Sequence, residues 1–344
     1  METGCYTAII TPFNDAGIDY IGLEKLVEFQ LANGITGIVS AGTTGESPTL
    51  TWDEHIKVIE AVSKKINDKC ICIAGTGSNN THESLAATKH AFNAGVNAAL
   101  LADPYYNGPS SLEIRKEYLE PVAKEFPSLK IVPYVIPGRT GTQLLPEDLA
   151  LIYREFNNVD TVKEATANIE NMRRIRQCCG NDFTILSGDD PLTFEMMTDP
   201  AIKAEGVISV ISNIAPKAVT DMVFFLAAGK IEEAKNLIIA LEPLFNIVTV
   251  KTKETTPYGE VICRARNPLA IKSLMALLGM PSGRCRQPLG KMTKNAINIV
   301  INAAKSAFSS NPAIFKPIED FFNVNIEERL NNQRYMAGLC YDEY

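Results

Sequence analysis

A single lysine, Lys163, ends a short apolar run within Thr161–Thr166 and is the leading candidate for chemistry in this chain. On a strand facing the inside of a closed barrel, scarce water disfavours the ammonium form. The pKa of the amine then falls, and the neutral amine becomes a nucleophile. Such an amine attacks a ketone to form a Schiff base, which acts as an electron sink when a carbon–carbon bond is made or broken. Most lysines at strand ends are surface residues, so this interpretation depends on the surroundings.

Other polar groups that suit this chemistry end other apolar runs. Tyr134 ends the preceding run, and its phenol can move protons if hydroxyl groups connect it to solvent. Thr44 and Tyr106 are the candidates for that hydroxyl chain. The turn Gly42–Gly45 offers backbone N–H groups and hydroxyls before a helix, which suits a carboxylate. Arg139 follows a Pro-Gly turn, and its planar guanidinium suits a second carboxylate.

These residues need elements that bring them to one place. Eight β-like runs occur at residues 7–13, 37–42, 70–77, 98–104, 131–137, 159–166, 183–190 and 206–213. Stretches of helical period separate them, at 21–33, 51–66, 81–93, 112–126, 146–156 and 168–179. Eight such units are the count of a (β/α)8 barrel, whose C-terminal strand ends form one catalytic rim. A doubly wound sheet is the alternative, but the Gly-x-Gly-x-x-Gly turn often found after its first strand is missing.

The pattern changes after residue 213. Residues 217–228, 231–250, 268–278 and 293–306 have helical period, with no further strand expected. Residues 251–266 are polar and irregular, so we expect a loop there. The predicted fold class is α/β, a (β/α)8 TIM barrel with a small C-terminal helical domain. The expected boundaries are a catalytic barrel over 1–228, the helical domain over 229–308 and a tail of unknown role over 309–344.

Composition narrows the class of protein. The net charge is -7 without a basic cluster, which argues against nucleic acid as a partner. No apolar run approaches the roughly 20 residues of a membrane helix, and the first residues lack the layout of a signal peptide. We therefore expect a cytoplasmic protein without a membrane partner. The 8 cysteines and 3 histidines have no metal-ligand or redox spacing, so we expect no metal site.

At these residues the chain resembles the dihydrodipicolinate synthase / N-acetylneuraminate lyase family of Schiff-base class I aldolases. The resemblance covers residues 1–306. It rests on the motifs GTTGE (42–46), AGTGSN (74–79), PYYN (104–107), YVIPGRTG (134–141), VKEAT (162–166), LSGDD (186–190) and GVISV (206–210). It implies a (β/α)8 barrel that carries a covalent pyruvate imine on Lys163 and needs no external cofactor. It also implies a homo-oligomer, most often a dimer of dimers.

The resemblance assigns roles to further residues. It implies a proton relay of Tyr134, Thr44 and Tyr106, in which Tyr106 reaches across a subunit interface into the neighbour's site. Thr43 and Thr44 would hold the pyruvate carboxylate. Two more residues would line the pocket, Gly188 and Ile208.

Arg139 separates the branches of the family, because the synthases use an arginine here for the carboxylate of aspartate semialdehyde and sialic acid lyases usually lack it. The resemblance thus implies condensation of pyruvate with L-aspartate 4-semialdehyde to 4-hydroxy-tetrahydrodipicolinate, the first committed step of diaminopimelate and lysine biosynthesis. The alternatives are a retro-aldol lyase for sialic acid or a keto-deoxy sugar acid, and a non-catalytic barrel that binds a keto acid. Two features depart from the family pattern, the insert 251–266 before Asn267-Pro268 and the tail after residue 306.

The resemblance also implies allosteric inhibition by L-lysine, bound in a cleft at a dimer interface. The matching positions are Ser47, Trp52, His55, Asn79, Glu83 and Tyr105. Glu83 can pair with the α-ammonium of lysine, Asn79 and Tyr105 can bond its carboxylate, and His55 can bond its tail. Trp52 can cover the aliphatic stem. The plainer alternative is that Trp52 packs and Glu83 is an acid in a first helical turn.

Overall fold

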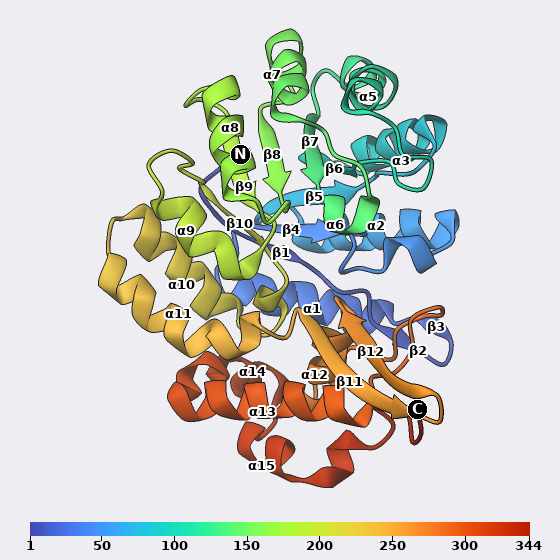
Figure 1. The fold of residues 1–344 in the computed structure, drawn as a ribbon, viewed down its shortest axis with the longest axis vertical. Coiled ribbons are helices and arrows are strands. Elements are labelled where there is room, and N and C mark those ends of the chain that lie inside the picture. The colour runs from blue at the N-terminus through green and yellow to red at the C-terminus, as the bar shows by residue number, and fades with distance from the viewer.

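The computed structural model describes all residues, 1–344, and confirms the predicted barrel (Figure 1). Eight parallel strands close on themselves in the order β1-β10-β9-β8-β7-β6-β5-β4, and β4 pairs with β1. Their bounds are β1 (Gly4–Ala8), β4 (Gly37–Ser40), β5 (Ile71–Gly75), β6 (Ala98–Ala102), β7 (Lys130–Val135), β8 (Thr161–Glu164), β9 (Thr184–Ser187) and β10 (Gly206–Ser209).

Helices surround the barrel (Figure 1). They are α1 (Tyr20–Ala32), α2 (Trp52–Ile66), α3 (Thr81–Asn93), α4 (Ser111–Glu113), α5 (Glu120–Glu125), α6 (Pro137–Thr140), α7 (Pro146–Glu155), α8 (Ile169–Cys179), α9 (Thr193–Thr198) and α10 (Pro216–Ala227). The expected helix 112–126 is divided, because a π-helical stretch, Ile114–Leu119, joins α4 to α5. The expected capping box forms, since the Thr51 hydroxyl accepts from Glu54 N and the Glu54 carboxylate accepts from Thr51 N.

The first strand begins earlier than predicted. The run 7–13 was expected to be extended, yet β1 covers Gly4–Ala8 and the chain then leaves the barrel. The side chain of Asn213, which lies beyond the end of β10, holds the backbone where the chain leaves the barrel. Its Nδ2 donates to Ala8 O at 2.7 Å, and its Oδ1 accepts from Ile10 N at 3.1 Å. The chain then turns through the short hairpin of β2 (Phe13–Asn14) and β3 (Gly17–Ile18).

The expectation that 251–266 is a loop is wrong, as is the helix predicted to run to residue 250. Helix α11 (Ile231–Phe245) ends earlier, and an antiparallel hairpin follows, β11 (Thr249–Thr256) and β12 (Gly259–Arg266). Val250, Thr252 and Glu254 are buried while the residues between them are exposed. That alternation has the two-residue period of a half-buried strand. It is hard to recognise in the sequence, because most of the residues that alternate are polar.

The C-terminal segments form helices that pack beside the barrel (Figure 1). They are α12 (Leu269–Leu278), α13 (Lys294–Ser310), α14 (Lys316–Phe322) and α15 (Ile326–Asn331). The tail is tied to earlier elements, because the Phe29 ring of α1 lies 5.4 Å from that of Phe321 and 5.1 Å from that of Phe322. Arg329 Nε also donates to Leu277 O at 2.7 Å. The tail therefore covers apolar surface of α1 and the end of α12.

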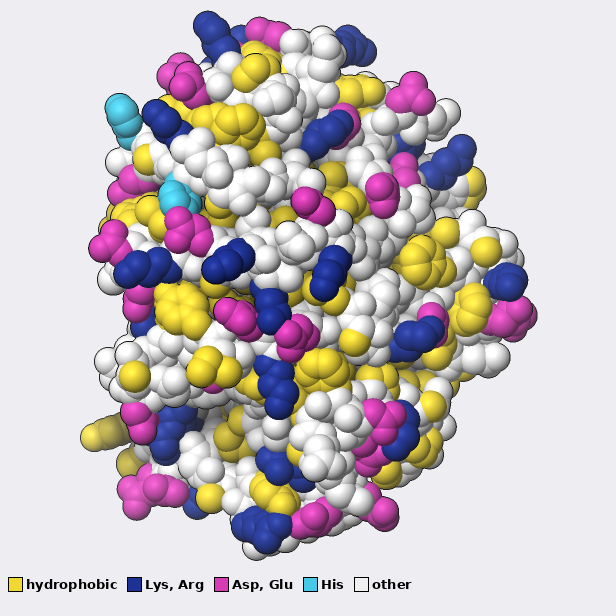
Figure 2. Space-filling model, turned by 180° about the vertical axis from the view of Figure 1, so that it is seen from behind, with side chains coloured by type: hydrophobic (Ala, Val, Ile, Leu, Met, Phe, Trp, Pro, Cys, Tyr) yellow, Lys and Arg dark blue, Asp and Glu magenta, His cyan; other side chains and the backbone are white.

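The surface carries charges of both signs. On the face that Figure 2 shows, basic and acidic side chains are interspersed and hydrophobic side chains form scattered patches. None of the helices is both long enough and apolar enough to span a bilayer.

Candidate active site

Lys163 and Tyr134 lie side by side on neighbouring strands, inside the rim of the barrel. The parallel register of β7 and β8 pairs the two residues directly. Lys163 Nζ is 3.9 Å from the centroid of the Tyr134 ring, and each residue is 5% exposed. Burial lowers the pKa of Lys163 to about 7; the charge of Asp190 opposes this shift and that of Arg139 favours it. A large share of this amine is therefore neutral and nucleophilic near neutral pH.

The Tyr134 phenol keeps its proton at neutral pH. Burial raises the pKa of Tyr134 to about 12, although the Arg139 charge and a hydrogen bond with Thr43 both lower it. A neutral phenol beside an amine can pass a proton in either direction, as general acid–base catalysis requires.

These side chains line a cavity of about 340 Å³ at the C-terminal ends of the strands. Its lining includes Thr44, Tyr134, Arg139, Lys163, Gly188, Val210 and Asn267. Gly188 is needed here because a Cβ at this position would lie 2.8 Å from Ala165 Cβ and 3.1 Å from Lys163 Cε. Ile208 is not in the lining; it lies in the apolar cluster inside the barrel, and Val210 lines the cavity instead.

The two threonines of the GTTGE motif point to different partners. Thr43 helps to lower the pKa of the Tyr134 phenol, whereas the Thr44 hydroxyl accepts from Asn267 Nδ2 at 2.9 Å. The predicted relay used Thr44 as the group next to Tyr134, but Thr43 is the threonine that acts on the pKa of this phenol. Alternate side chains of an irregular turn cannot be assigned from sequence, because the turn has no fixed period.

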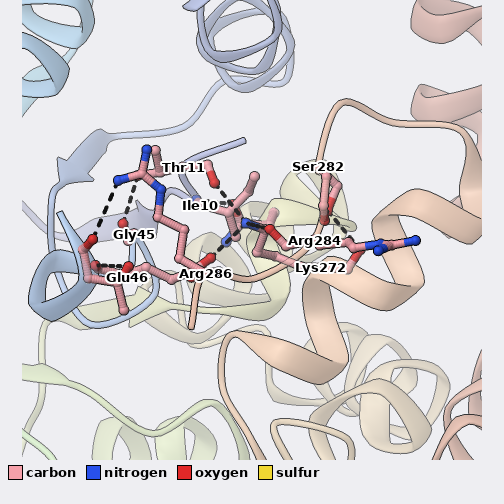
Figure 3. Close-up of polar contacts among 11 residues, drawn as sticks. Ile10, Thr11, Gly45, Glu46, Lys272, Ser282, Arg284 and Arg286 are labelled. Carbon is pink, nitrogen blue, oxygen red and sulfur yellow. Dashed lines mark hydrogen bonds and ion pairs between the residues drawn. The ribbon is translucent and has the colours of Figure 1, made fainter. Parts of the chain in front are cut away.

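A buried ion pair fixes the GTTGE turn from the C-terminal region (Figure 3). Lys272 of α12 is 1% exposed, and its Nζ donates to Glu46 Oε1 at 2.6 Å and to Thr11 O at 2.9 Å. The other carboxylate oxygen, Glu46 Oε2, accepts from Arg286 N at 2.8 Å. Sequence reasoning missed this pair, although Lys272 is the only charged residue of the apolar helix LAIKSLMALL.

Arg139 lies at the mouth of the cavity on the short helix α6. Its side chain is partly exposed, and its Nη2 donates to Asn267 O at 3.0 Å. The carboxylate of Asp190, in the LSGDD motif, has a structural role. It accepts from Val210 N at 2.9 Å and from Ile211 N at 3.2 Å, and so fixes the chain at the end of β10. Burial raises the pKa of Asp190 to about 6.

Tyr106 does not enter the cavity of its own chain. Its side chain is 94% exposed, and its backbone has φ +76°, a left-handed conformation that non-glycine residues rarely adopt. An exposed aromatic residue held in a strained turn is typical of a functional position.

The six residues expected to bind lysine line one further cavity, of about 480 Å³. They are Ser47, Trp52, His55, Asn79, Glu83 and Tyr105. Asn79 Oδ1 accepts from Tyr105 N at 2.7 Å, and the Trp52 and His55 rings meet edge-on at 5.2 Å. Burial lowers the pKa of His55 to about 4, so this imidazole is neutral at pH 7. Thr43, Tyr134 and Arg139 also line this cavity, so it adjoins the site around Lys163.

No group of three or more His, Cys, Asp or Glu side chains is arranged to hold a metal ion. Around Lys163 the polar lining includes hydroxyls, amides, an amine and a guanidinium, which suit carboxylates and carbonyl compounds, together with the Asp189 carboxylate.

Known proteins with similar sequences and folds point to one family. The profile described as the dihydrodipicolinate synthetase family matches residues 1–307. A 4-hydroxy-tetrahydrodipicolinate synthase of Methanococcus vannielii is 40% identical over 292 residues, which are 85% of this chain and 94% of that protein.

Two solved structures have the same fold. The 4-hydroxy-tetrahydrodipicolinate synthase of Methylacidiphilum fumariolicum superposes with a TM-score of 0.81 at 32% identity, covering 94% of this chain and 100% of that one. The enzyme of Cyanidioschyzon merolae, solved with lysine bound, gives 0.80 at 33% identity, covering 89% and 98%. The chain therefore belongs to the dihydrodipicolinate synthetase family.

Proposed function

We propose that the protein condenses pyruvate with L-aspartate 4-semialdehyde to 4-hydroxy-tetrahydrodipicolinate, through a Schiff base on Lys163. The observation that carries this proposal is the buried Lys163 amine, with its pKa lowered to about 7, 3.9 Å from the Tyr134 ring in a cavity that also holds Thr44 and Arg139. Relatives named 4-hydroxy-tetrahydrodipicolinate synthase indicate the product, and the family resemblance supplies the two substrates. A cytoplasmic location and a role in lysine biosynthesis belong to the same proposal.

The chemistry begins with addition of the neutral amine to the pyruvate ketone. Loss of water from the carbinolamine gives the imine, and loss of a methyl proton gives an enamine. The enamine carbon attacks the aldehyde carbon, and the aldehyde oxygen takes up a proton. Attack of the semialdehyde's amine on the imine carbon closes the ring and releases Lys163. The lysine is the electron sink throughout, so the proposed reaction needs no external cofactor.

Proton transfers at these stages are assigned to Tyr134 and Thr43, with Tyr106 of a neighbouring subunit completing the relay. We assign this role to Thr43 and not Thr44, because Thr43 acts on the pKa of the phenol, whereas the Thr44 hydroxyl is bonded to Asn267. Thr44 is then the side chain that holds the pyruvate carboxylate. The exposure and strained backbone of Tyr106 support its placement across an interface. The proposal therefore includes a homo-oligomer.

A substrate panel tests the reaction. Each assay contains pyruvate with aspartate semialdehyde, or one sugar aldehyde, and the cleavage direction is assayed with sialic acid and keto-deoxy sugar acids. We expect turnover with aspartate semialdehyde and at most traces with the sugars. Preferential cleavage of a sugar acid would identify a retro-aldol lyase, and no turnover in any assay would favour a non-catalytic barrel.

We also propose that L-lysine inhibits the enzyme from the 480 Å³ cavity. Its support is the convergence of the six expected residues and the lysine-bound structure of the Cyanidioschyzon relative. Because the cavity adjoins Tyr134 and Thr43, a ligand there can act on the relay; such coupling is typically about 1–3 kcal/mol. L-lysine should inhibit the wild type and not Glu83→Ala at fixed substrates. Equal responses of the two proteins would remove the regulatory proposal and leave the catalytic one.

A further inference from the structure

Asn267 contacts both Arg139 and Thr44 in the lining of the active-site cavity, and the proposed mechanism gives it no role. It follows β12 directly and is 6% exposed. Its backbone N–H donates to Val248 O at 2.9 Å, which closes the base of the hairpin. Its carbonyl accepts from Arg139 Nη2 at 3.0 Å, and its Nδ2 donates to Thr44 Oγ1 at 2.9 Å.

Two arginines hold the end of the hairpin against α6. Arg139 of α6 donates to the carbonyl of Asn267, and Arg266 of β12 donates back to the carbonyl of Gly138 at 3.3 Å. In Figure 1 the hairpin extends from this junction, away from the barrel. These two hydrogen bonds fix the backbone at Asn267 and at the preceding residue. The short side chain of Asn267 therefore has little freedom to move away from Thr44.

The hydrogen bond from Asn267 determines what Thr44 can do. An amide NH₂ group only donates, so the Thr44 oxygen is the acceptor and its own proton stays free. The amide oxygen, Asn267 Oδ1, is buried and has no partner, so it does not draw that proton. Thr44 can then donate to a carboxylate oxygen in the cavity, and hydrogen bonds to a charged acceptor are stronger than neutral ones.

We propose that Asn267 is a positioning residue for pyruvate, which orients the Thr44 hydroxyl as a donor to the substrate carboxylate. The inference rests on the proposed function, because pyruvate is the ligand it concerns. Its consequence is that the hairpin insert, which departs from the family pattern, supports the pyruvate site by holding Asn267, the residue that follows it.

Asn267→Asp tests the inference, because it keeps the shape of the side chain and replaces the donor with an acceptor. The carboxylate takes the Thr44 proton and repels the pyruvate carboxylate. We expect the KM for pyruvate to rise at least about tenfold, and more than in Asn267→Ala. A purely structural role predicts the reverse order, since the near-isostere would preserve packing. The melting temperature of each variant separates these effects from unfolding.

Asn246→Asp is the matched control, because Asn246 lines the same cavity from the exposed end of α11. It adds the same charge without contacting Thr44, so we expect a change of at most about threefold in the same KM, given screening by water and salt. An effect as large as that of Asn267→Asp would show that charge alone is responsible, and would overturn the inference.

A double-mutant cycle keeps the inference testable if the aspartate variant folds poorly. In a Thr44→Val background, Asn267→Ala should change the pyruvate KM by less than about twofold, because its target hydroxyl is gone. Fully independent effects, or an Asn267→Asp enzyme with the wild-type KM, would overturn the inference alone. Failure of the wild type to form a borohydride-trapped pyruvate adduct would instead contradict the proposed function.

Discussion

Lys163 differs from the other buried lysine of the chain, Lys272, in its partners. Lys272 Nζ is bonded to the Glu46 carboxylate and to two backbone carbonyls, so its charge is compensated. Both amines lie over an aromatic ring, but Lys163 forms no ion pair, and burial lowers its pKa to about 7. Burial of a lysine without a carboxylate partner is costly for stability, and this cost is typical of a group kept for chemistry.

Arg139→Ala should mainly impair use of aspartate semialdehyde. Loss of a charge-assisted contact to a carboxylate costs about 1.5–3 kcal/mol, or roughly ten- to a hundredfold in kcat/KM for that substrate. Because the Arg139 charge helps to lower the pKa of Lys163, the acid limb of the pH profile should also move to higher pH. Arg264→Ala, on the exposed part of β12, is the control. If pyruvate binding fails while the second substrate is unaffected, Arg139 has a different role.

The residues found from sequence and those missed differ in the range of their interactions. Lys163 and Tyr134 end adjacent strands, so the alternation of strands and helices was enough to predict that they meet. The contact of Thr44 with Asn267 spans 223 residues, and that of Glu46 with Lys272 spans 226. No local pattern specifies such contacts, because they depend on how the C-terminal helices dock on the barrel.

At the scale of elements, the GTTGE turn is held in place by α12. The barrel supplies the strand that precedes this turn. The charge that compensates the Glu46 carboxylate comes from outside the barrel, from Lys272 of α12. Eight strands were predictable because each is a short apolar run between helices of regular period. The hairpin of β11 and β12 was not predicted, because its alternating residues are mostly polar and only a few face the protein.

Lys272→Met should destabilise the whole protein strongly. It leaves the Glu46 carboxylate buried without its partner, and breaking a buried pair costs about 3–5 kcal/mol in the free energy of unfolding. Denaturant unfolding measures this change. Replacing both partners, Lys272→Met with Glu46→Leu, should recover part of the loss, since no uncompensated charge remains.

Lys316→Ala is the control, because the Lys316–Asp320 pair lies on the surface and such pairs contribute little. A Lys272→Met protein as stable as this control would show that the buried pair does not hold the turn.

At the scale of the whole molecule, the proposed relay requires Tyr106 from a second chain. Tyr106 is 94% exposed, whereas Tyr134 and Lys163 are each 5% exposed. The adjacent Tyr105 lines the proposed lysine cavity, so an interface at this face would join catalysis, assembly and regulation. Sequence could propose this arrangement only through family resemblance, since no pattern in one chain shows where a second chain docks.

Mixed oligomers test this arrangement. Tyr106→Phe and Lys163→Ala should each be nearly inactive alone, but co-assembled subunits should regain activity in sites that combine an intact Lys163 with an intact Tyr106 from the neighbour. Activity should rise when the two proteins are mixed under subunit exchange. No recovery, with mixed oligomers verified by mass, would mean that each site is built from one chain.

The central claim is that the Lys163 amine forms an imine with pyruvate, and borohydride trapping tests it most directly. Peptide mass spectrometry after reduction should locate the pyruvyl adduct on Lys163 and not on Lys272, whose amine is held by Glu46 and two carbonyls. Since the pKa of Lys163 is lowered to about 7, the initial trapping rate should fall about tenfold per pH unit well below pH 7 and level off above it. An adduct absent from Lys163, or one formed equally on Lys272, would contradict the account.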